Sequence, residues 1–505
     1  MAAIDLGANS LRMVIAQVSP DGRIEVLERL QRAVRLGQDT FRRGRLGAGG
    51  MRAAVAILRE YRRMMETYKV ERVRAVATTS VREAGNADNF LNRVYMATGL
   101  NLEVIATSEE SRLTVSAVRR AVSGALGVSR GHALIVDVGG GSTLVTHLED
   151  GEIVNSLSLR LGSIRLQEML FTSEESPERS ADLLRNHIAT VVGGVEQTLP
   201  LAGVRSFVAV GGDARFASRE VGAPTDSADL YLVAQSDLEK LIGRCEHFAA
   251  EELAKRYGLP FPEAETLVPA LLVYQHLLEK SGVDQMIVSR ISMRDGLLLE
   301  LAQQVTGQED QAMTEGVIHS ALSIAQKYRV NLEHSVNVGD AAARLFDELR
   351  AEHGLSPRHR LLLRVAGMLH EIGSFVSNQA HHKHSYYLIQ HSEIFGLDRN
   401  ELALVAHVAR YHRRSPPKAA HVEYMSLPRE SRITVNKLAA ILRVADALVR
   451  GRGRHPEQLR FEHGRDELIV RVPSLANYLL EQRALALKGD MFEEVYGMRL
   501  RLEDG

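Results

Sequence analysis

A short pattern, Asp-x-Gly-x-x-Ser, occurs twice in this 505-residue chain, at positions 5–10 and 137–142. Each copy lies between two apolar segments, and apolar runs on both sides of a glycine-containing loop predict a β-hairpin. A strand–loop–strand unit that recurs within a region of about 300 residues predicts two related domains facing each other across a cleft. The flanking apolar segments are 2–4, 11–18, 133–136 and 145–148.

Both loops have the composition of a phosphate site. Glycines let the backbone approach an anion closely, and hydroxyl side chains add hydrogen-bond donors. Asp5 and Asp137 end their strands at the loop mouths, where phosphate would repel them unless a divalent cation or ordered water lay between. Mg²⁺ is the natural candidate, with Mn²⁺ as the alternative. Two tight hairpins with turn-capping aspartates are the other explanation. The expected phosphate-binding residues are Gly7, Asn9, Ser10, Gly139, Gly140, Gly141, Ser142 and Thr143.

Composition narrows the class of protein. A chain of 505 residues is too long for one hydrophobic core, so we expect three or four domains, and 45% hydrophobic with 25% charged residues is typical of globular proteins. No apolar run is long enough to cross a bilayer, and no signal sequence is expected. The single cysteine, Cys245, agrees with a reducing compartment such as the cytoplasm. A net charge of -1 predicts no general attraction to nucleic acid or membrane, so a polyanion has to meet a local basic patch.

These motifs resemble the exopolyphosphatase and guanosine pentaphosphate phosphohydrolase family (Ppx/GppA), a branch of the actin, sugar kinase and Hsp70 superfamily. The resemblance extends over nearly the whole chain. Besides the two loops, it is carried by segments 77–84 (ATTSVREA), 105–113 (IATSEESRL), 208–213 (VAVGGD), 366–373 (AGMLHEIG) and 384–389 (HSYYLI).

The resemblance implies an α/β fold class with four domains. Two actin-like (ASKHA, ribonuclease H-like) domains are expected, followed by an all-helical HD-like domain and a small α+β domain at the C-terminus. Apolar spacing independently predicts helices from about 310 to 450. Short strands are predicted at 459–463, 467–472 and 498–502, with a helix near Met491. The expected domains are 1–113, 114–300, 301–455 and 456–505.

The resemblance also implies two catalytic residues. Glu110 would be the general base that deprotonates the attacking water, and Arg82 would lie beside the terminal phosphates. Locally, segment 102–106 predicts a strand and Ser108 is a plausible N-cap for a helix that begins near Glu109. Complementation of the helix dipole by Glu109 and Glu110 is the simpler explanation for these carboxylates.

Two positions depart from the family pattern. The resemblance implies that Gly211 and Gly212 line the cleft and belong to the phosphate-binding residues. Asp213, however, replaces the usual small hydroxyl residue, which argues against nucleotide binding there. Leu144 stands where the family has a glutamate after the second loop. Glu149 is not expected to replace it, because it would point to the opposite face of an extended strand.

Histidines cluster in the second half, with 12 of 19 between positions 319 and 421. Some of them fall in the order and helical context of the HD phosphohydrolase superfamily, with glutamate in place of the usual aspartate, and manganese, iron or zinc would suit such ligands. A metal-free domain that adds basic surface and a dimer contact is the alternative. The HD-like ligands are His334, His370, Glu371 and Asp446, with His384, His407 and His412 as candidates for a two-metal site.

The leading prediction is an exopolyphosphatase that releases terminal orthophosphate from inorganic polyphosphate with a bound divalent metal. Hydrolysis of guanosine pentaphosphate (pppGpp) to the tetraphosphate is the second enzymatic reading. A sensor that binds polyphosphate or the alarmone without turnover is the third, motivated by Leu144. Metal-dependent hydrolysis in the HD-like half is the fourth. The family leads us to expect a homodimer.

Overall fold

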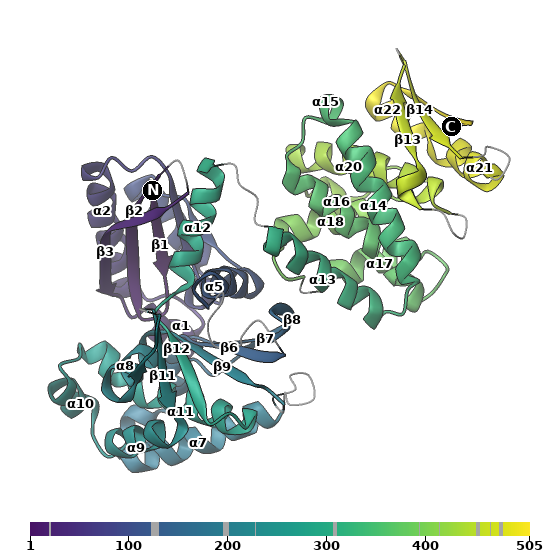
Figure 1. Cartoon of the computed structure of the whole chain (residues 1–505). Coiled ribbons are helices and arrows are strands. Elements are labelled where there is room, and N and C mark those ends of the chain that lie inside the picture. Colours follow the sequence, from purple (N-terminus) through teal and green to yellow (C-terminus); the bar gives the residue numbers. More distant parts are fainter. Residues whose placement is uncertain are drawn as a thin grey trace. The chain divides into compact units, whose positions relative to one another are not determined.

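The chain forms two compact units, Met1–Gln311 and Ala312–Gly505 (Figure 1). Each unit is described by itself. No helix in the described residues is long and apolar enough to span a membrane. The computed structural model describes residues 1–19, 22–122, 131–194, 201, 203–227, 229–306, 311–392, 394–413, 415–450, 455–464, 466–473 and 478–504.

The first unit contains a five-stranded sheet with the order β3-β2-β1-β4-β5. β1 pairs antiparallel with β2 and parallel with β4, and all five of its residues are buried, as expected for a strand covered on both faces. The elements of this part are β1 (Ala2–Leu6), β2 (Ser10–Val18), β3 (Ile24–Ala33), α1 (Leu36–Arg43), α2 (Ala48–Thr67), β4 (Val73–Ala77), α3 (Thr79–Arg82), α4 (Ala87–Thr98), β5 (Leu102–Val104) and α5 (Thr107–Val122).

A second, seven-stranded sheet has the order β10-β11-β12-β9-β6-β7-β8. Its β6 pairs antiparallel with β7 and parallel with β9, which repeats the arrangement around β1. The strands are β6 (His132–Val138), β7 (Thr143–Glu149), β8 (Glu152–Leu159), β9 (Ser206–Val210), β10 (Ala223–Pro224), β11 (Leu230–Ala234) and β12 (Gln285–Ser289). The helices are α6 (Ser163–Leu170), η1 (Thr172–Glu174), α7 (Pro177–Gly193), α8 (Gly212–Val221), α9 (Gln235–Cys245), α10 (Ala250–Tyr257), α11 (Phe261–Ser281) and α12 (Met293–Thr306).

The two predicted hairpins are confirmed, and their loops close in the same way. The amide of Gly7 donates to the carbonyl of Ser10 at 3.1 Å, and the amide of Gly139 donates to the carbonyl of Ser142 at 3.0 Å. The sequence repeat is therefore also a repeat of backbone geometry.

Helix α12 returns to the first sheet at the end of this unit. It packs against α5 and β1, and its Gly296 lies so close to the backbone of Leu113 that a side chain there would overlap it. The limits of the two actin-like domains within the unit stay a prediction.

Helix α5 begins earlier than the sequence predicts. The amides of Glu109 and Glu110 both donate to the carbonyl of Ala106 at 3.1 Å, so Ala106 occupies the N-cap position. The prediction of Ser108 as the N-cap is wrong, because Ser108 already lies in the first turn.

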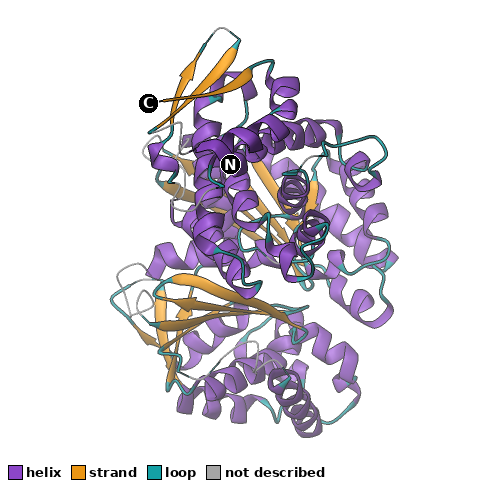
Figure 2. Cartoon of the chain, turned by 90° about the vertical axis from the view of Figure 1, so that its right-hand side faces the viewer, coloured by secondary structure: helices purple, strands orange, loops and turns teal. Residues whose placement is uncertain are grey.

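The second unit begins with helices, which confirms the helical prediction for this region. In Figure 1 the labelled elements of this unit from α13 to α20 are all helices, and Figure 2 shows a small orange sheet beside the C-terminus. Asp398 and Glu401 form a capping box at the start of α18, one local reason why a helix starts there. The helices are α13 (Gln311–Lys327), α14 (Leu332–Glu348), α15 (Arg350–His353), α16 (Pro357–Leu369), η2 (Ile372–Phe375), α17 (His381–Gln390), α18 (Arg399–Arg410), α19 (Val422–Met425) and α20 (Arg429–Leu448).

A three-stranded sheet with the order β13-β14-β15 follows, close to the three strands that the sequence predicts. Its buried residues, such as Leu468, belong to the same hydrophobic core as Leu442 of α20. The domain boundary expected at residues 455 and 456 stays a prediction. The elements are η3 (Pro456–Gln458), β13 (Arg460–His463), β14 (Glu467–Val472), α21 (Leu479–Lys488), α22 (Asp490–Tyr496) and β15 (Arg499–Asp504).

Close packing of the second loop predicts a strong effect of Gly162→Ala. A methyl group at Gly162 would overlap the backbone of Gly141 and Ser142. We expect overpacking to destabilise the protein by about 1–3 kcal/mol, seen as a lower midpoint in thermal unfolding.

Gly49→Ala is the matched control, because no atom lies within 4 Å of a methyl group at this position inside α2. It should stabilise the helix by up to about 1 kcal/mol. Equal unfolding midpoints for Gly162→Ala and the native chain would contradict the packing of this loop.

Candidate active site

A cavity of about 960 Å³ in the first unit is lined by both hairpin loops. A methyl group on Gly140 of the second loop would lie 3.0 Å from Cβ of Ala8 in the first. The hydroxyl of Ser142 lies 3.1 Å from that of Thr79, which follows β4. The structure thus brings together the two segments that the sequence repeat predicts to face each other.

The polar side chains of the loops are placed differently. Ser10 and Ser142 line the cavity, and Asn9 lines it while its amide donates to the carbonyl of Pro262 at 2.7 Å. Thr143 is fully buried, and its hydroxyl donates to the carbonyl of Leu161 at 2.8 Å. Thr143 is not among the described residues that line the cavity.

Glu110 lines the cavity from the first turn of α5, and only 8% of it is exposed. Burial raises the pKa of its carboxyl to about 7, although the neighbouring Arg82 opposes this shift; the negative charges of Asp5 and Asp137 add to it. A carboxyl with this pKa exchanges protons near neutral pH, as a general base has to do.

Arg82 lies behind Glu110 rather than on the cavity wall. It forms an ion pair with Glu110 and donates to the carbonyl of Ile105 at 2.7 Å and to the hydroxyl of Thr79 at 3.0 Å. It is not among the described residues that line the cavity, so this geometry suits orientation of Glu110 and Thr79.

The two loop aspartates have different surroundings. Asp5 lies 3.3 Å from the guanidinium of Arg294 and 3.9 Å from that of Arg12. Burial raises the pKa of Asp137 to about 6, against the opposing charges of Arg215 and Arg12. In the described part of the chain no ion pair is recorded for Asp137.

Leu144 is the counterpart of Arg12 in the structural repeat. Arg12 pairs with Asp5 across β1 and β2, and Leu144 pairs with Asp137 across β6 and β7. Leu144 lines the cavity, whereas Glu149 is not among its described lining residues. The second aspartate therefore faces an apolar side chain where the first faces a cation.

Sequence reasoning missed the arginines of this cavity. Arg12 interrupts an apolar strand, which was a readable signal, and Arg294 follows strand β12 at the start of α12. Burial lowers the pKa of Arg294 to about 10. Guanidinium groups bind phosphate oxygens well, so this wall suits a polyanion. The lining arginines are Arg12, Arg215, Arg219, Arg290 and Arg294.

Gly211 and Gly212 line the cavity where β9 leads into α8. Gly211 has a φ of 123°, and a methyl group there would lie 3.0 Å from the hydroxyl of Tyr274. Burial raises the pKa of the adjacent Asp213 to about 7, and Glu263 adds to this effect.

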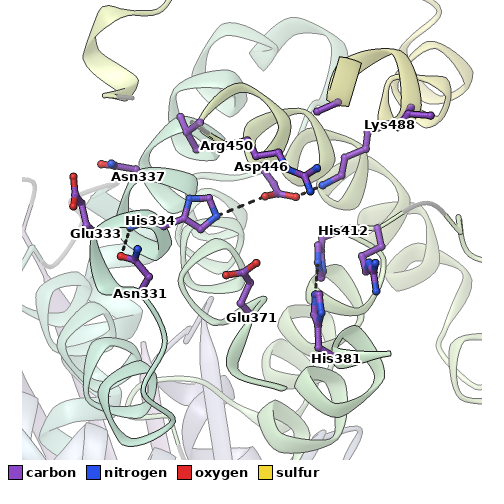
Figure 3. A pocket seen from close by; sticks show the side chains of 14 residues that line it. Asn331, Glu333, His334, Asn337, Glu371, His381, His412, Asp446, Arg450 and Lys488 are labelled. Atoms are coloured by element: carbon purple, nitrogen blue, oxygen red, sulfur yellow. Dashed lines mark hydrogen bonds and ion pairs between the residues drawn. The ribbon is translucent and has the colours of Figure 1, made fainter. Parts of the chain in front are cut away.

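A separate pocket of about 760 Å³ in the second unit contains part of the predicted histidine cluster (Figure 3). His334, Glu371, His412 and Asp446 line it, and His370 is buried behind it with its Nε2 atom 3.8 Å from Asp446.

The structure does not bring the other two candidate histidines to this pocket. His407 packs against Tyr386, with ring centroids 4.8 Å apart, and burial lowers its pKa to about 4. His384 is not among the described lining residues. His381, which sequence reasoning did not single out, lies 3.2 Å from Nε2 of His412.

Relatives align with most of this chain. Two proteins called guanosine-5'-triphosphate,3'-diphosphate pyrophosphatase are similar. The one from Vibrio campbellii is 25% identical over 423 residues, covering 82% of this chain and 80% of that protein. The one from Vibrio vulnificus is 26% identical over 457 residues, covering 88% and 85%.

Solved structures resemble about three-fifths of the chain. A Ppx/GppA family member from Aquifex aeolicus is 27% identical, covers 61% of this chain and 98% of that chain, and has a TM-score of 0.50. An exopolyphosphatase from Cytophaga hutchinsonii has a TM-score of 0.55 with 22% identity, covering 60% and 97%, and shows likeness of fold alone. The actin-like α/β fold is thereby confirmed.

The profile of the Ppx/GppA phosphatase family matches residues 14–305, and that of Ppx/GppA phosphatase domain III matches residues 318–491. Together these matches cover most of the chain, so the protein belongs to the Ppx/GppA phosphatase family, a family of hydrolases.

Proposed function

We propose that the protein is an exopolyphosphatase, which releases terminal orthophosphate from inorganic polyphosphate by direct attack of water. The observation that carries this proposal is the shared cavity, because two glycine loops, a buried carboxylate and several arginines meet around it. A chain of phosphates has anionic oxygens along its whole length and no other group to recognise. The loops and the arginine wall match that chemistry.

Glu110 would take the proton from the attacking water. With a pKa of about 7, about half of this carboxyl is ionised at neutral pH and able to accept a proton, and its ion pair with Arg82 fixes its orientation. The cavity arginines would stabilise the negative charge on the phosphate oxygens during transfer, which is electrostatic catalysis without a covalent enzyme intermediate.

Asp137 is the best-suited residue to hold a divalent cation. Asp5 is paired with Arg294, so its charge is already balanced, whereas Asp137 is a partly buried carboxylate in the cavity wall without a recorded ion pair among the described residues. Mg²⁺ often binds to one or two carboxylates together with substrate phosphates, and Mn²⁺ takes similar ligands. When bound, such an ion would neutralise phosphate charge near Asp137.

Hydrolysis of pppGpp is the second candidate function. Two relatives that align with more than four-fifths of the chain carry the name of that activity. The same cavity is also lined by Phe216 and Tyr231, whose rings offer apolar surface that a phosphate chain does not need. A nucleoside would use that surface.

Three further features are part of the proposal. The single cysteine, Cys245, supports a cytoplasmic location. The family resemblance supports a homodimer. The meeting of His334, Glu371 and Asp446 in one pocket supports an HD-like helical domain in the second unit.

Glu110→Gln should abolish phosphate release from long-chain polyphosphate, lowering the rate by about 10²- to 10⁴-fold because the general base is lost. Glu109→Gln is the matched control. Glu109 lies in the same helical turn and is bonded to Arg74 and Arg112, and it is not among the described cavity residues. Release of phosphate by Glu110→Gln at the native rate would refute the proposed site.

The same assay on the native chain distinguishes polyphosphate hydrolysis from pppGpp hydrolysis and from binding without turnover. Faster turnover of pppGpp than of polyphosphate, with pppGpp as a competitive inhibitor, would assign the second function. Tight polyphosphate binding without release, with Mg²⁺ or Mn²⁺ present, would identify a sensor and contradict an enzyme.

The pH dependence should follow the titration of Glu110. Since the ionised form accepts the proton, kcat/KM should fall about tenfold per pH unit below pH 7 and level off above it. The measurement is kcat/KM between pH 5 and 9 at constant Mg²⁺, with circular dichroism to verify folding. A constant rate from pH 5 to 8 would show that the base has an ordinary carboxyl pKa.

A further inference from the structure

In the pocket of the second unit, buried imidazoles lie close to carboxylates. The pocket contains two groups of possible metal ligands, and both groups contain His370. Within each group, the ligand atoms lie within 4.8 Å of one another. Figure 3 shows His334, Glu371, His412 and Asp446 directed toward one space. The groups are His334 with His370 and Glu371, and His370 with His412 and Asp446.

Hydrogen bonds fix the tautomers of the two most buried histidines. Nδ1 of His370 lies 2.6 Å from the carbonyl of Gly367, and Nδ1 of His412 lies 2.6 Å from the carbonyl of Ala409. A carbonyl only accepts, so each Nδ1 carries the proton. In a neutral ring, Nε2 then presents its lone pair, which is how metal-binding histidines are oriented.

Nε2 of His370 is a buried atom whose hydrogen-bonding capacity is not satisfied by the described residues. The residue is 0% exposed, and this atom has no hydrogen-bond partner among the described residues. It lies 3.8 Å from Oδ1 of Asp446, and Nε2 of His334 lies 3.8 Å from the same oxygen. Ligand atoms around one transition-metal ion are separated by roughly 3–4 Å, so these positions suit a single shared ion.

Other side chains of the protein contact the ligand atoms of Asp446 and His412. The ammonium of Lys488, on α21, forms an ion pair with Oδ2 of Asp446. Lys488 and Asp446 are each only 8% exposed, so this cation replaces water at the carboxylate. On the opposite side, Nε2 of His381 lies 3.2 Å from Nε2 of His412.

We infer that this pocket binds one divalent transition-metal ion through His370, His412 and Asp446, in competition with the ammonium of Lys488. His334 and Glu371 are close enough to complete the ligand set. Lys488 neutralises Asp446 in the metal-free protein and has to leave it when the ion binds. Metal affinity is thus reduced by the ion pair between α20 and α21.

Titration of the metal-free full-length chain with Co²⁺ tests this inference, because the visible absorption of bound Co²⁺ reports nitrogen ligands. Lys488→Gln should bind Co²⁺ at least tenfold more tightly than the native chain, since the competing cation is gone. The same variant should have a lower thermal unfolding midpoint without metal, because Asp446 loses its partner, and a larger rise in midpoint when Co²⁺ is added.

Four variants complete the test. His412→Gln should lose the absorption band, whereas His391→Gln, an exposed histidine of the same unit, should keep it. Lys327→Gln removes an exposed lysine of the unit and should leave the affinity unchanged. Asp137→Asn removes the carboxylate proposed to bind a cation in the first unit and should also keep the band.

Absence of histidine-type Co²⁺ absorption in both the native chain and Lys488→Gln would overturn the inference. Retention of the band in His412→Gln would overturn the ligand assignment. Equal affinity in Lys488→Gln and the native chain would overturn the competition.

Discussion

The contact between two glycine hairpins is the constraint on which the first unit depends. Gly140 lies against Ala8, and a methyl group on Gly141 would lie 2.9 Å from the Cβ atom of Thr79. Packing therefore disfavours a side chain at both glycine positions. Because each loop follows a buried strand of its own sheet, this contact places the ends of those two strands at one cavity.

Charge in this cavity is distributed unequally between the two halves of the repeat. Asp5 faces Arg12, and Asp137 faces Leu144 at the equivalent pair of strand positions. The first aspartate is thus paired with cations of the protein, and the second is the residue that we propose to hold a divalent cation. Leu144 stands where the family pattern has a glutamate, so the proposed chemistry depends on Glu110 and on the arginines of the wall.

Features encoded locally were predictable from the sequence. Both hairpins and the three C-terminal strands follow from apolar alternation and glycine, and the structure confirms them. The start of α5 was not predictable in this way. It depends on which carbonyl accepts the first helical hydrogen bond, and that carbonyl is Ala106, whose side chain carries no capping signal.

Residues that reach the sites through tertiary contacts could not be predicted. Arg294 reaches Asp5 because α12 returns to the first sheet, a long-range event without a local pattern. His407 has the same residue type as His412 and lies five positions earlier, yet it packs among tyrosines, because that separation places the two side chains on different faces of the helix end. Histidine content indicated the second pocket, and burial and hydrogen bonding decide which histidines belong to it.

A crystal structure of Glu110→Gln with a linear polyphosphate and Mg²⁺ tests the central claim most directly. The account predicts that the terminal phosphates lie between Gly7–Ser10 and Gly139–Ser142, in contact with both loops and beside position 110. A phosphate chain that contacts only one of these loops, or that binds outside the cavity they share, would contradict it.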